Sequence, residues 1–189
     1  LISYINPDGA EPTTVSLVYG EENYCVPMAV TKRDGIGQWY TGEEALSRAD
    51  QSGFTPVKDF YKKALSGEKI IVDAGLYEAS DIFTIYLRRL IEMAQSMSGV
   101  RETEMIVFCV QDVTKEAVSL FTAAASRIGI DIQKTAVIDK KEAFYYYCLS
   151  QLSELKKHDM ALFECEDLNV YALRLNKNSS DDGELITLD

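Results

Sequence analysis

The stretch YEASDIFTIYLRRLIEMAQSMSGVRETEMIVFCVQDVTKEAVSLFTAAASRIGI, residues 77–130, contains the pattern of a helix, a strand and a second helix. Apolar side chains recur every three or four positions in 79–97 and again in 117–128, which predicts two amphipathic helices. Gly99 and Gly129 are placed to end these helices, and Thr114 is placed to cap the second. The intervening run TEMIVFCV is nearly all apolar, which is typical of a strand covered on both faces.

The residues before this stretch predict a small antiparallel sheet and two short helices. LISYI, TTVSLVYG and ENYCVPMAV are separated by the turn sequences NPDGAEP and GEEN, so we expect a three-stranded antiparallel meander within residues 1–30. TGEEALSRA predicts the first helix, because Thr41 and Glu44 have the spacing of a capping box. TPVKDFYKKALSG predicts the second helix, and EKIIVDAGLY predicts a strand with a turn.

The residues after the stretch continue the alternation of strand and helix. IDIQKTAVI predicts a strand, and Asp139 with Glu142 three residues later predicts the capped start of the helix KKEAFYYYCLSQLSEL. MALFECE, LNVYALRL and ELITL then predict three strands in a row. The alternation in the middle of the chain implies a parallel core that two antiparallel ends extend. The predicted fold class is therefore α/β with a mixed sheet.

Composition and charge exclude several classes of function. The 189 residues have a net charge of -11, and nucleic acid is therefore not an expected partner, because phosphate binding needs clusters of Lys and Arg. The chain has no apolar run of the roughly 18 residues that a membrane span requires. Four cysteines lie far apart and among apolar residues, so we expect buried thiols, no disulfide and a cytoplasmic protein; they are Cys25, Cys109, Cys148 and Cys165.

One predicted hairpin has an unusual turn. LFECEDLNVYALRL, residues 162–175, reads as a strand, a tight turn and a second strand, with Glu164, Glu166 and Asp167 at the turn. Three carboxylates at such a corner either hold a cation or occupy a place where something else once bound.

Taken together, these patterns resemble the N-terminal lobe of the actin-like ATPases, which include actin, heat-shock chaperones of the DnaK type and bacterial cytoskeletal homologues. The resemblance rests on the opening meander, QWYTGEEAL, residues 77–130 and AVIDKKEAFYYYCLSQ. It implies an actin-like (ribonuclease H-like) mixed sheet with the meander, β-α-β-α units and helices on both faces. Residues 1–189 would form a single lobe with a variable insert at 35–78. The chain starts without Met and ends in a strand-like run, so we expect it to be part of a longer protein whose C-terminal lobe is its partner.

The resemblance also locates the first nucleotide loop. Asn6, Thr13 and Thr14 lie where the family reads D-x-G-T-T/S, and Asn6 or the preceding Ile5 replaces the Asp that works with magnesium. The turn is longer than in the family and contains two prolines, which lack amide donors. The two threonines match in type only.

The second phosphate loop and the catalytic helix depart further from the family. Glu164, Glu166 and Asp167 lie where the family reads D-x-G-G-G-T, and their charge would repel a phosphate that glycines let approach. Lys140 replaces a Glu that often positions the attacking water in the family.

We therefore expect a non-catalytic scaffold or adaptor, a pseudo-ATPase that binds other proteins, with no catalytic residue, metal or cofactor. Exposed residues between Gly35 and Gly67 are the expected contact surface, because this insert varies most in the fold that the chain resembles. Two alternatives stay open. One is a divergent ATPase or kinase that binds Mg-ATP, and the other is a cytoskeletal homologue that polymerises.

Overall fold

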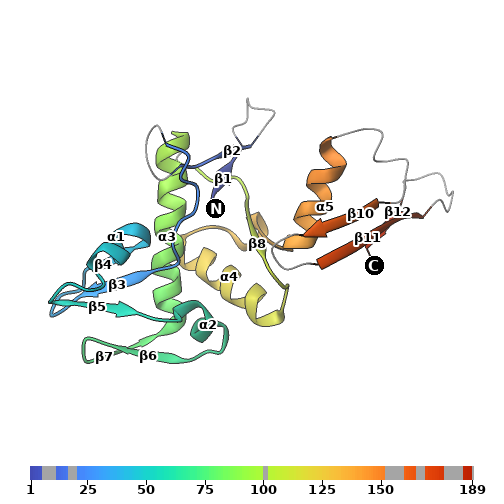
Figure 1. Cartoon of the computed structure of the whole chain (residues 1–189). Helices are drawn as coiled ribbons and strands as arrows, with labels where there is room; N and C mark the ends of the chain where they lie inside the picture. Colours follow the sequence, from blue (N-terminus) through green and yellow to red (C-terminus); the bar gives the residue numbers. More distant parts are fainter. Residues whose placement is uncertain are drawn as a thin grey trace. The chain divides into compact units, whose positions relative to one another are not determined.

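The structure, a computed structural model, describes the backbone of residues 1–5, 12–16, 21–99, 102–151, 160–164, 169–176 and 185–188 (Figure 1). From residue 148 onward the description covers the backbone alone. The chain divides into two compact units, Leu1–Val137 and Ile138–Asp189.

The first unit combines short strands with helices of very different lengths (Figure 1). Its strands are β1 (Ser3–Tyr4), β2 (Thr13–Thr14), β3 (Val30–Arg33), β4 (Trp39–Thr41), β5 (Phe54–Val57), β6 (Lys69–Val72), β7 (Gly75–Glu78) and β8 (Ile106–Val110). Its helices are α1 (Gly42–Arg48), α2 (Phe60–Leu65), α3 (Ala79–Ser98), α4 (Lys115–Ile128) and the 3-10 turn η1 (Ile132–Lys134). β9 (Thr135–Asp139) follows η1 and crosses into the second unit.

The strands pair into several small sheets. β3 lies between β4 and β5, and both pairings are antiparallel. β6 and β7 form an antiparallel hairpin of their own, in which Ile71 lies opposite Leu76. β1 pairs with β2 over two residues each, and β8 pairs with β9.

The core of the first unit surrounds α3. One side of this helix is buried, as the apolar spacing predicts, and Ile82, Phe83 and Leu87 lie on it. Phe121 of α4 packs edge-on against Phe83 with ring centroids 5.1 Å apart, and it packs against Phe108 of β8 at 4.7 Å. Such pairs add about 0.5–1.5 kcal/mol each beyond the area they bury. The core therefore ties the predicted helix–strand–helix stretch together.

The predicted ends of these helices are confirmed. The Thr114 hydroxyl accepts a hydrogen bond from the Ala117 N–H at 3.1 Å, which satisfies one of the free amides of α4. Gly99 follows α3 and Gly129 follows α4, both in the left-handed conformation that ends helices.

The second unit contains α5 (Lys140–Gln151), β10 (Met160–Glu164), β11 (Asn169–Asn176) and β12 (Leu185–Leu188). The Lys141 N–H donates to the Asp139 carboxylate at 2.8 Å, so the predicted cap of α5 is confirmed. The three strands form an antiparallel sheet in chain order, which confirms the predicted hairpin of residues 162–175 and the strand that follows it.

The mixed α/β class is confirmed, but two parts of the predicted sheet are wrong. Among the described residues, the opening meander is reduced to the two-residue pairing of β1 with β2, because residues 22–29 form no strand. Pro27 has no N–H to donate, and its carbonyl accepts from Ala29 N in a tight turn. The described strands form separate small sheets instead of one mixed sheet. All of their pairings except that of β8 with β9 are antiparallel, and the parallel core expected around β8 and β9 stays a prediction.

Three side-chain predictions are also wrong. Thr41 precedes α1 but makes no capping hydrogen bond. Cys25 and Cys109 are exposed instead of buried, while Cys148 and Cys165 lie outside the described side chains. Cys109 is exposed because β8 alternates: Phe108 and Val110 are buried, and the residues between and beside them are not. This strand is therefore covered on one face.

Candidate functional site

The predicted residues of the first nucleotide loop have local structural roles. Thr13 and Thr14 form β2, where they are exposed and lie opposite Tyr4 and Ser3. The hydroxyls of Thr14 and Ser3 are hydrogen-bonded to each other at 3.1 Å. Asn6 lies outside the described residues.

The other predicted positions belong to the second unit. Lys140 is the first residue of α5, and Glu164 is the last residue of β10, where it lies opposite Asn169. Glu166 and Asp167 lie outside the described residues. The described positions are thus divided between two units, and their equivalence to nucleotide loops stays a prediction.

The predicted insert, residues 35–78, has a prominent apolar surface that the sequence reasoning did not single out. On the outer side of the β6–β7 hairpin, Ile71 is 75% exposed and Leu76 is 64% exposed. Lys69 and Glu78 lie opposite each other on the same side and form an ion pair at 2.9 Å. We call these four residues the hairpin face. The alternation of strand residues, together with a two-residue turn, is the sequence signal that could have revealed it.

The inner side of the same hairpin belongs to the core. Ile70 and Val72 are buried there, and Tyr77 packs edge-on against Trp39 of β4 at 5.2 Å. The Tyr77 ring also lies over Gly75, because a Cβ added at Gly75 would be only 2.7 Å from it. The hairpin is therefore held firmly on one side and open to solvent on the other.

A partly buried ion pair fixes the turn of the hairpin. The Lys32 side chain is 6% exposed, and its ammonium group donates to the Asp73 carboxylate at 2.7 Å. The N–H of Gly35 donates to the same oxygen at 2.7 Å. These bonds hold the pKa of Asp73 below its usual value, and the bond to Asp73 raises the pKa of Lys32 against the opposing effect of burial. The contact joins the β3–β4 turn to the β6–β7 turn.

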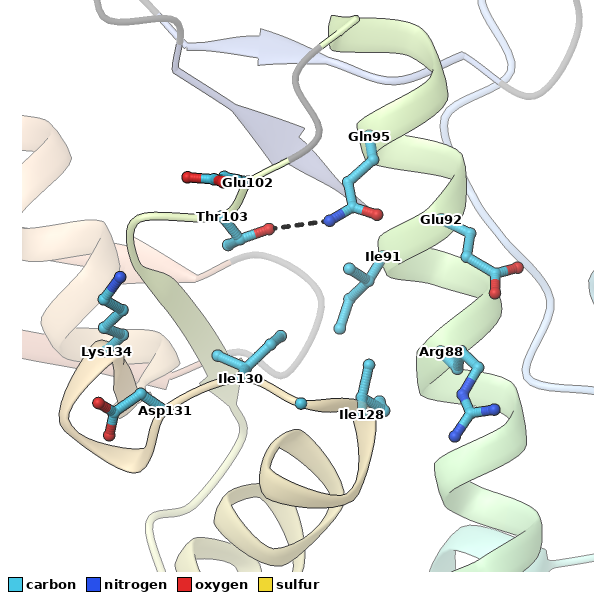
Figure 2. Close-up of a pocket in the computed structure, with 11 residues that line it drawn as sticks. Arg88, Ile91, Glu92, Gln95, Glu102, Thr103, Ile128, Ile130, Asp131 and Lys134 are labelled. Carbon is cyan, nitrogen blue, oxygen red and sulfur yellow. Dashed lines mark hydrogen bonds between the residues drawn. The ribbon is translucent and has the colours of Figure 1, made fainter.

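A groove lies elsewhere on the first unit, between α3 and the segment that leaves α4 (Figure 2). Its volume is about 710 Å³. Ile91, Ile128 and Ile130 form an apolar floor, and the Gln95 amide donates to the Thr103 hydroxyl at 3.2 Å near one end. Charged side chains form the rim; they are Arg88, Glu92, Glu102, Asp131 and Lys134. We call this feature the isoleucine groove.

The described residues hold neither a metal cluster nor a membrane-spanning helix. No group of three or more His, Cys, Asp or Glu side chains lies close enough there to hold a metal ion. In the same part of the chain, no helix combines the length and the apolar character needed to cross a membrane.

Comparison with known proteins places the chain in a family without assigning it an activity. Neither the curated proteins nor the solved structures include a significant match. A family model described as "Family of unknown function (DUF5716) C-terminal" matches residues 11–189, which is nearly the whole chain. The chain therefore belongs to this family of unknown function.

Proposed function

We propose that this chain is a non-catalytic scaffold or adaptor domain that acts by binding other proteins. The hairpin face is the observation on which the proposal rests. Ile71 and Leu76 are two large aliphatic side chains directly opposite each other, and both are mostly in water. Single exposed apolar residues are common on protein surfaces, but adjacent ones on an ordered strand pair are typical of interaction sites.

The residues that pack beneath the hairpin face favour binding, because they keep this surface ordered. Tyr77 and Trp39 pack under it, and Lys32 bonds to Asp73 at its turn. A surface that is already ordered loses little conformational freedom when a partner binds. The apolar centre would supply about 25 cal/mol for each Å² removed from water, and the flanking Lys69–Glu78 pair would form part of a polar rim.

The proposal includes the resemblance to a degenerate N-terminal lobe of an actin-like ATPase. The succession of α3, β8 and α4 and the three strands that end the chain support it. The other lobe of such a protein is the first expected partner. Glu166 and Asp167 at the position of the second phosphate loop would repel phosphate, and Lys140 lacks the carboxylate that positions the attacking water, so the proposal includes no cofactor and a cytoplasmic location.

Site-specific photo-cross-linking in cells that produce the protein tests this proposal. A photoreactive residue replaces Leu76, and a matched control replaces Ser119, which is exposed on α4. We expect a discrete adduct with another protein from position 76, none from position 119, and loss of the adduct when Ile71→Lys is added. Because Ile71 is exposed, this change should leave the circular dichroism spectrum unaltered.

Three results would contradict the proposal. They are the absence of any adduct, equal adducts from both positions, and an adduct that persists with Ile71→Lys. An adduct only between copies of the chain would favour the polymerising alternative.

A further inference from the structure

We propose that the isoleucine groove binds an extended segment of a partner protein in which an aliphatic side chain is flanked by lysine or arginine. This site lies outside the hairpin face, so it goes beyond the function proposed above. The groove belongs entirely to the first unit, and all of its lining residues are described.

The floor of the groove accommodates an aliphatic side chain. Ile91 belongs to the apolar core, and Ile128 and Ile130 pack against that core from its edge. Between them, Gly129 turns the chain with a φ of +96°, and a Cβ added there would meet no atom within 4 Å. The three isoleucines thus present apolar surface to an open space of about 710 Å³ (Figure 2). An aliphatic anchor would remove this surface from water.

The rim favours a positively charged ligand. It carries three carboxylates, Glu92, Glu102 and Asp131, against the two cations described above. The helix α4 also ends at Ile128 in the lining of the groove, where the helix dipole adds partial negative charge. The whole chain has a net charge of -11, which attracts basic segments over a longer range.

The three carboxylates of the rim differ in the hydrogen bonds and ion pairs that they already form. Asp131 accepts a hydrogen bond from the N–H of Gln133 at 2.9 Å, and Glu92 lies 3.6 Å from Arg89 in an exposed pair. Within the described part of the chain, Glu102 forms no ion pair. Glu102 is therefore the first group assigned to the ligand's cations, and Glu92 is the second because its pair with Arg89 is long and exposed. Arg88 and Lys134 would repel the same cations.

Fluorescence anisotropy with two labelled pentapeptides tests this assignment on the full chain. The basic probe is Lys-Lys-Leu-Lys-Lys and the acidic probe is Glu-Glu-Leu-Glu-Glu. We expect the basic probe to bind more tightly, and its affinity should fall as salt is added. Tighter binding of the acidic probe, or equal binding of both, would overturn the proposal.

Charge variants identify the groove as the site. Glu92→Gln with Glu102→Gln should weaken binding of the basic probe by about two- to tenfold, and Arg88→Gln with Lys134→Gln should strengthen it. Glu43→Gln with Asp50→Asn is the matched control, because both residues are exposed near α1 and their loss changes the net charge equally. The inference fails if the control weakens binding as much as the groove variant does.

Methyl labelling of isoleucine separates this inference from the function proposed for the hairpin face. In two-dimensional spectra with the basic probe, the methyl signals of Ile128 and Ile130 should shift, and that of Ile71 should not. A shift confined to Ile71 would overturn the inference and leave the hairpin face as the binding surface. Absence of any shift at saturating probe would overturn it as well.

Discussion

At the scale of single residues, the contact between Lys32 and Asp73 makes the first unit sensitive to acid. The pKa of Asp73 is below its usual 3.8, so its contribution to stability is present above that value and is lost as the pH falls through the lowered pKa. The pKa of Lys32 is raised above 10.5, so its contribution is lost only as the pH rises through that higher value. Asp73→Asn should therefore lower the unfolding midpoint at pH 7.

Thermal unfolding at several pH values checks this expectation. The difference between wild type and Asp73→Asn should shrink as the pH falls from about 4 through the lowered pKa of Asp73, because Asp73 of the wild type becomes neutral over this range. Asp50→Asn, a change at an exposed carboxylate, serves as the control. A difference that stays constant from pH 7 to pH 2 would show that the charge of Asp73 does not stabilise the hairpin turn.

Two substitutions at neighbouring residues of the hairpin turn should change the free energy of unfolding in opposite directions. Ala74 has a φ of +59°, so Ala74→Gly should increase the free energy of unfolding by about 0.5–1 kcal/mol. In Gly75→Ala, the added Cβ would press on the Tyr77 ring that Trp39 supports, and the expected loss is about 1–3 kcal/mol. Urea unfolding measures both values, and equal signs would show that the turn geometry is misassigned.

At the scale of secondary-structure elements, two similar capping signals have different outcomes. Thr114 bonds to the Ala117 N–H, whereas Thr41 forms no cap because Gly42 follows it with a φ of +63°. Thr114→Ala should therefore reduce the free energy of unfolding by about 1 kcal/mol. Thr41→Ala should change it by less than half as much, as judged by urea unfolding. Equal losses would contradict this distinction.

Periodicity and stop signals predicted the long helices well, but they predicted the first strands poorly. The helices α3 and α4 have complete apolar stripes and end at Gly99 and Gly129, so local sequence determines them. β3 contains the polar residues Thr31 and Lys32, and both are buried because each finds a distant partner. The Thr31 hydroxyl donates to the Ala45 carbonyl at 2.9 Å. No local pattern reveals such pairing, and the sequence therefore does not predict this strand.

At the scale of the whole molecule, the candidate surfaces depend on contacts between residues far apart in the chain. The four residues of the hairpin face could be read from strand alternation, but their rigidity depends on Lys32, which lies 41 positions before Asp73. The isoleucine groove joins α3 to the segment after α4, and sequence patterns predict only the order of these elements. Pattern reasoning therefore located the elements and missed the surfaces that they form.

The predicted degenerate loops also yield an expectation for the whole molecule. If the nucleotide-binding site is lost at other positions as well as at its second loop, replacing Glu166 and Asp167 by glycine should not create ATPase activity. Asn6 and Lys140 would still stand where the resemblance to actin-like ATPases predicts acidic residues. A phosphate-release assay of the double variant checks this. Turnover above that of the wild type would show that the rest of an active site is present.

Calorimetric titration of Mg-ATP and Mg-ADP into the longest natural form of the protein tests most directly the claim that it is a non-catalytic protein-binding domain. We predict no saturable heat and no shift of the unfolding midpoint with either nucleotide. Saturable binding with a Kd below about 100 μM, roughly -5.5 kcal/mol, would contradict the claim and favour a divergent ATPase.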